Sequence, residues 1–115
     1  MSYGDDTMTK IMIMPTKENL KEVVEYTDAL LLGVKDMNVN MPDAFEIGEI
    51  KEICNTHIDK EIFVALNKNM HTKDLDNLRK ILIELDKLNL AGIFYYDIAV
   101  VEYMKELNIK TPLVW

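Results

Sequence analysis

Residues 61–97 read EIFVALNKNMHTKDLDNLRKILIELDKLNLAGIFYYD, and this stretch decides the fold class. Residues 61–66 are almost entirely apolar, which is typical of a strand covered on both faces of a parallel sheet. Residues 72–88 repeat apolar side chains every three or four positions, which predicts an amphipathic helix with Thr72 as N-cap and a left-handed Asn89 after its end. Residues 91–96 are apolar again. The stretch therefore predicts a right-handed parallel βαβ unit.

The same alternation continues on both sides of this unit. Further strands are expected at residues 11–14, 29–33 and 111–115. Further helices are expected at residues 17–26, 46–55 and 98–107, and residues 34–45 are expected to form a loop. The pattern predicts an α/β protein with about five parallel strands and four helices.

Two architectures fit this repeat. One is half of a TIM-like (β/α)8 barrel, and the alternative is a flavodoxin-like doubly wound sheet. Polar residues follow the apolar strands repeatedly, and in a barrel all such loops lie on one face, which favours the barrel. Residues 11–115 are then expected to be the N-terminal half of a barrel, either truncated or self-assembling. Residues 1–10 are expected to be a disordered start or an expression remnant.

Charge and cysteine content exclude several classes of function. Thirteen basic and twenty acidic residues give a formal net charge of −7, which argues against nucleic acid and against anionic membranes as partners. No apolar run approaches the roughly 20 residues of a membrane span. The single cysteine, Cys54, and the lack of a signal sequence indicate a cytoplasmic protein.

The polar residues after the strands are the best candidates for a functional site. As catalytic groups we expect His71, which carries a titratable imidazole, and Asp97, whose carboxylate can act as a base. As substrate-binding groups we expect Lys35, Asn38, Asn67, Lys68, Asn69 and Tyr96. A structural role also fits several of these residues, because asparagines shape turns and Asp97 can cap the next helix. No metal site is expected, because the two histidines lack a metal-binding spacing.

Four segments resemble the collagenase-like peptidase family, peptidase family U32. They are VEYTDALLLGVKDMNVN (residues 24–40), FEIGEIKEICNTHIDKEIFVALNKNMH (residues 45–71), DLDNL (residues 74–78) and LAGIFYYDIAVVEYMKELNIKTPLVW (residues 90–115). Together they cover nearly all of the chain after residue 10, and the resemblance lies in their pattern and order.

The resemblance implies a TIM-like barrel and a hydrolase with a pocket at the C-terminal ends of its strands. Members of the family are described as proteases, and several relatives act in RNA or quinone hydroxylation pathways. Some relatives carry an iron–sulfur cluster, but a single Cys54 does not support that cofactor here. The expected partner is a small molecule or peptide, together with either a second copy of the chain or the rest of the same barrel. The alternative is a non-catalytic binding or assembly domain, and we expect this segment alone to be inactive.

Overall fold

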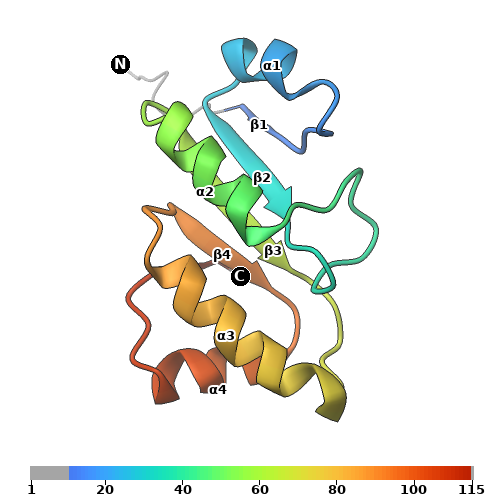
Figure 1. The fold of residues 1–115 in the computed structure, drawn as a ribbon, viewed down its shortest axis with the longest axis vertical. Coiled ribbons are helices and arrows are strands. Elements are labelled where there is room, and N and C mark those ends of the chain that lie inside the picture. Colours follow the sequence, from blue (N-terminus) through green and yellow to red (C-terminus); the bar gives the residue numbers. More distant parts are fainter. Residues whose placement is uncertain (1–10, 115) are drawn as a thin grey trace, which may run out of the picture.

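The computed structural model describes residues 11–114 of the chain. The expectations for residues 1–10 and for Trp115 lie outside this range. Strands and α-helices alternate along the described residues (Figure 1). The strands are β1 (Met12–Ile13), β2 (Ala29–Gly33), β3 (Glu61–Leu66), β4 (Gly92–Tyr95) and β5 (Leu113–Val114). The α-helices are α1 (Leu20–Val23), α2 (Ile47–Thr56), α3 (Leu75–Asp86) and α4 (Ile98–Glu106).

The strands form one parallel sheet in the order β1-β2-β3-β4-β5, so each strand pairs with its neighbours in the sequence. The predicted α/β class with five parallel strands and four helices is confirmed. A flavodoxin-like sheet has the order 2-1-3-4-5, whereas the strands of a (β/α)8 barrel follow one another in sequence. Helix α3 contacts both α2 and α4, and in Figure 1 α2 and α3 lie over the same face of the sheet. The strand order and this shared face favour the barrel alternative.

The core lies between the sheet and these helices. Leu32, Val64 and Ile93 occupy matching positions on β2, β3 and β4, and each is fully buried. Leu78, Leu82 and Leu85 project from α3 and are fully buried in the same cluster. Side chains alternate between the two faces of a strand, so the other face carries residues such as Leu31, Phe63 and Phe94.

That second face is apolar and partly exposed. Phe63 and Phe94 meet edge to face, with their ring centroids 5.7 Å apart. Gly92 lies beside them, and a Cβ atom at this position would come within 2.6 Å of the Val114 side chain. A glycine is therefore needed at Gly92 for β4 and β5 to approach each other closely.

The first predicted helix, residues 17–26, begins later than expected. Thr16 and Asn19 bond each other reciprocally: the Asn19 N–H donates to Thr16 Oγ1 over 3.0 Å, and the Thr16 N–H donates to Asn19 Oδ1 over 2.8 Å. This closes a turn before α1, and α1 then continues as a 3-10 helix, Val24–Tyr26. Side chains that bond the nearby backbone compete with helix formation in this way.

The predicted helix at residues 72–88 also differs at both ends. Its first turn is a 3-10 helix, Thr72–Asp74, whose N-cap is His71 rather than Thr72. The helix ends at Asp86, and the expected left-handed conformation at Asn89 is wrong. The non-glycine residues with positive φ in the described chain are Asp36, Asn40 and Asn108.

Asp86, at the end of α3, links this helix to the loop before β5 by hydrogen bonds. One of its oxygens, Oδ1, accepts hydrogen bonds from the N–H groups of Lys110 and Thr111, both at 3.0 Å, and from the Thr111 hydroxyl at 2.9 Å. Burial alone raises the pKa of Asp86, but the hydrogen bonds from Thr111 and Lys110 outweigh it and hold this pKa below its ordinary value. The ionised form is therefore the one that the folded chain stabilises.

We expect the stabilising contribution of Asp86 to disappear in acid. A group with a lowered folded pKa stabilises the protein above its unfolded pKa, and this contribution is lost as the pH falls through the folded pKa. Asp86→Asn should therefore be less stable than wild type at pH 7, and the gap should narrow below about pH 4. Urea unfolding at several pH values measures this gap. The same gap at pH 7 and pH 3 would contradict the assignment.

Candidate functional site

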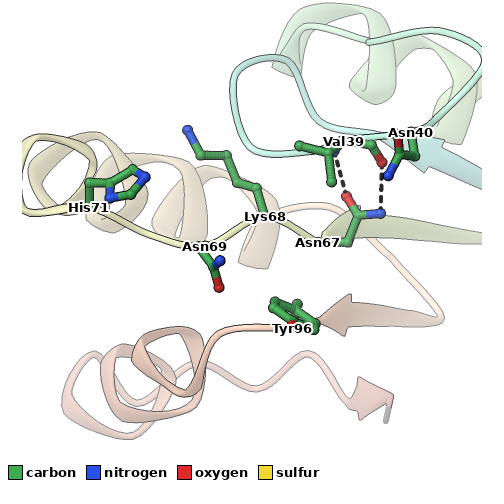
Figure 2. A pocket seen from close by; sticks show the side chains of 7 residues that line it. All are labelled: Val39, Asn40, Asn67, Lys68, Asn69, His71 and Tyr96. Carbon is green, nitrogen blue, oxygen red and sulfur yellow. Dashed lines mark hydrogen bonds between the residues drawn. The ribbon is translucent and has the colours of Figure 1, made fainter.

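A pocket of about 590 Å³ lies at the C-terminal ends of the strands (Figure 2). Its walls come from the three loops that follow β2, β3 and β4. The lining residues are Val39, Asn40, Asn67, Lys68, Asn69, His71 and Tyr96. Its volume lies within the range of about 300–1,000 Å³ that is usual for small-molecule sites.

The loop after β2 is held closed at its base. Val34 and Phe45 form a parallel bridge, in which the Phe45 N–H donates to the Gly33 carbonyl over 2.7 Å and the Lys35 N–H donates to the Phe45 carbonyl over 3.0 Å. Asn38 packs against Gly33, where an added Cβ atom would lie 2.8 Å from the Asn38 side-chain nitrogen. The loop therefore projects from a fixed base, and its tip reaches the pocket.

Asn67 joins that loop to the end of β3. Its Nδ2 donates to the Val39 carbonyl and its Oδ1 accepts from the Val39 N–H, both over 3.0 Å (Figure 2). The side-chain amide thus pairs with the N–H and the carbonyl of one residue, as the backbone of a neighbouring strand would. Asn67 therefore positions the pocket wall, and these two bonds leave one of its amide hydrogens unused.

Lys68 and His71 are held by Asp74. The Lys68 ammonium lies 3.3 Å from Asp74 Oδ2, and the backbone N–H of His71 donates to the same oxygen over 2.9 Å. The hydrogen bond from His71 and then the charge of Lys68 hold the pKa of Asp74 below its ordinary value. This cluster gives the loop after β3 a fixed shape. The charge of Lys68 is already partly neutralised by Asp74.

Asp97 connects the loops after β3 and β4. Its Oδ2 accepts from the Met70 N–H over 2.7 Å, and its Oδ1 accepts from the Ala99 N–H over 2.9 Å at the start of α4. The predicted N-cap is therefore confirmed. Both oxygens are bonded to backbone and Asp97 is not among the pocket-lining residues, so we treat it as a positioning residue.

Three polar groups at the pocket are free of protein partners. The side chains of Asn40, Asn69 and Tyr96 form no hydrogen bond within residues 11–114. Tyr96 is 65% exposed although it is a large aromatic residue. In the view of Figure 2, Asn69 extends to the side of its loop on which Tyr96 lies, whereas Lys68 extends to the other side. These free groups are available to a ligand.

The structure brings together most of the predicted site. Asn67, Lys68, Asn69, His71 and Tyr96 line the pocket, whereas Lys35, Asn38 and Asp97 do not. Lys35 instead lies 3.8 Å from Glu46 in an exposed ion pair.

Sequence reasoning missed Val39 and Asn40, which come from the tip of the first loop. Asn40 adopts a positive φ of 57°, which asparagine tolerates better than most residues. An asparagine directly before the Met41-Pro42 pair is the signal that could have identified this turn.

A comparison with models of protein families establishes the family of this chain. The model of peptidase family U32 matches residues 16–114 of the chain. This chain belongs to peptidase family U32. All of the pocket residues lie within the matched range. No curated protein and no solved structure matches the chain significantly.

Among the described residues of this U32 chain, no group of three or more His, Cys, Asp or Glu side chains is placed to hold a metal ion. None of the helices in the same residues combines the length and the apolar character of a membrane span.

Proposed function

We propose that this U32 chain is the N-terminal segment of a TIM-like barrel hydrolase of the cytoplasm, and that its pocket binds a peptide. The observation that carries the proposal is the pair of free amide side chains, Asn40 and Asn69, on the loops after β2 and β3 that line the pocket. A side-chain amide offers one acceptor and two donor hydrogens, so it can pair with both groups of a peptide bond. Pockets at this end of a barrel are where such enzymes carry out their chemistry.

His71 is the proposed acid–base group of the pocket. Its imidazole can donate or accept a proton, and it lines the same space as the two amides. The exposed Tyr96 ring provides an apolar surface with a hydroxyl group for a peptide side chain. Completion of the barrel, by a second copy or by the rest of the same barrel, stays a prediction.

A titration of the isotopically labelled chain with acetyl-triglycine amide tests peptide binding. This probe presents only peptide groups, so we expect NMR shift changes at the side-chain amides of Asn40 and Asn69. Asn69→Ala should weaken binding by about tenfold, since a lost hydrogen bond to a buried partner is worth about 1–2 kcal/mol. The matched control is Asn77→Ala, which removes an exposed amide from α3. Shifts that spread over the whole surface, or equal affinities in both variants, would overturn the proposal.

A further inference from the structure

A second cavity, of about 250 Å³, lies at the opposite end of the sheet from the peptide pocket. It is formed where α2 ends, where β3 begins and where the chain leaves α3. Three lysines line it: Lys51 on α2, Lys60 before β3 and Lys87 after α3. Apolar side chains of Ile58, Ile62 and Leu88 line the same space.

The cavity is positively charged in a chain whose formal net charge is −7. No aspartate or glutamate lines it within the described residues. Lys87 is paired with Glu84 at 3.0 Å, but Lys51 and Lys60 form no ion pair within residues 11–114. Lysines often complement the negative C-terminal end of a helix, and this accounts for Lys87. It does not account for Lys51, which lies in the middle of α2.

An exposed apolar surface adjoins these charges. Ile58 is 84% exposed, whereas Ile62 is only 3% exposed and forms the inner wall of the cavity. Small-molecule sites typically combine an apolar lining with a few converging polar groups. Ammonium groups beside apolar walls match a molecule that has an apolar body and a negatively charged head.

We propose that this cavity binds a small amphipathic carboxylate. The apolar body of the ligand contacts Ile58 and Leu88, and its carboxylate lies between the ammonium groups of Lys51 and Lys60. The site is independent of the peptide pocket, because the two cavities share no lining residue. It lies between two helices on the outside of the sheet, where closing a barrel would leave it accessible.

The single cysteine of the chain reports on this cavity. Cys54 is half-buried and lines the same space, so a bound molecule shields its thiol from alkylation. Burial raises the pKa of this thiol, so the reaction with iodoacetamide is followed at pH 9, where more thiolate is present. Octanoate serves as the amphipathic carboxylate, octanol as its uncharged counterpart, and inorganic phosphate as an anion without an apolar body.

We expect octanoate, at about ten times its dissociation constant, to slow the alkylation of Cys54 about tenfold. Octanol and phosphate should give little protection. In Lys51→Gln/Lys60→Gln the protection should be largely lost. The matched control Lys73→Gln/Lys80→Gln removes the same charge from exposed positions outside the cavity and should keep it. The proposal would be overturned if octanoate gave no protection, or if octanol protected Cys54 as well as octanoate does. It would also be overturned if phosphate protected Cys54 and octanoate did not, or if octanoate fully protected the Lys51→Gln/Lys60→Gln variant.

Discussion

Leu82→Ala should lower the free energy of unfolding by about 2–5 kcal/mol, the largest single effect that we expect in this chain. Leu82 is fully buried at the centre of α3, where it belongs to the core cluster between helices and sheet. The substitution removes buried apolar surface and leaves a cavity whose walls can relax only partly. Since small domains are stable by about 5–15 kcal/mol, a loss of this size removes a large part of the total.

Ile83→Ala provides the control for this prediction. Ile83 is the next residue of the same helix, but it is 42% exposed. The helix propensity of alanine exceeds that of isoleucine, so this change should alter the stability by less than about 1 kcal/mol. Urea unfolding followed by circular dichroism compares the two variants. Equal losses for Leu82→Ala and Ile83→Ala would show that α3 does not pack on the sheet as the structure describes.

The second large effect is expected at Asp97. Asp97→Ala removes both the N-cap of α4 and the acceptor for the Met70 N–H, which lies 2.7 Å from the carboxylate. A lost cap typically costs about 1 kcal/mol, and a lost hydrogen bond to a charged group costs a similar amount or more. We therefore expect about 2–3 kcal/mol of destabilisation together with a loosened loop after β3.

The variant Asp97→Asn separates these two roles. Asparagine keeps one acceptor for the Ala99 N–H but turns an N–H₂ group toward Met70, so the cap should survive and the link to Met70 should not. Hydrogen exchange of the Met70 amide is the measurement, and it should quicken in Asp97→Asn while the first turn of α4 stays protected. Unchanged exchange at Met70 in Asp97→Asn would show that the link has no role in ordering the loop.

The strands were the most predictable part of the fold. The predicted strands 29–33 and 61–66 coincide with β2 and β3, because a continuous apolar run in a buried parallel strand has clear limits. Helix ends were less predictable, because a few hydrogen bonds decide them. Two helices begin at other residues than predicted, because side chains there bond the backbone in place of helical hydrogen bonds. These bonds join Thr16 with Asn19 and His71 with Asp74.

The site was predictable where residues follow a strand directly. Asn67, Lys68, Asn69 and Tyr96 come immediately after β3 and β4, so the topology alone brings them to one edge of the sheet. The tip of the first loop was not predictable in this way. Whether residue 38 or residue 40 reaches the pocket depends on the turn within the loop, and the apolar pattern contains no information on that turn.

The bridge between Val34 and Phe45 has a consequence for how members of this family can vary. Because the bridge closes the loop at its base, both ends of the loop stay fixed whatever the number of residues between Val34 and Phe45. Lengthening such a loop costs only about 0.6 kcal/mol for each doubling of its length. Insertions near Asn40 can therefore reshape the pocket rim while the strands keep their register, so ligand preference can diverge between relatives without any change in the scaffold.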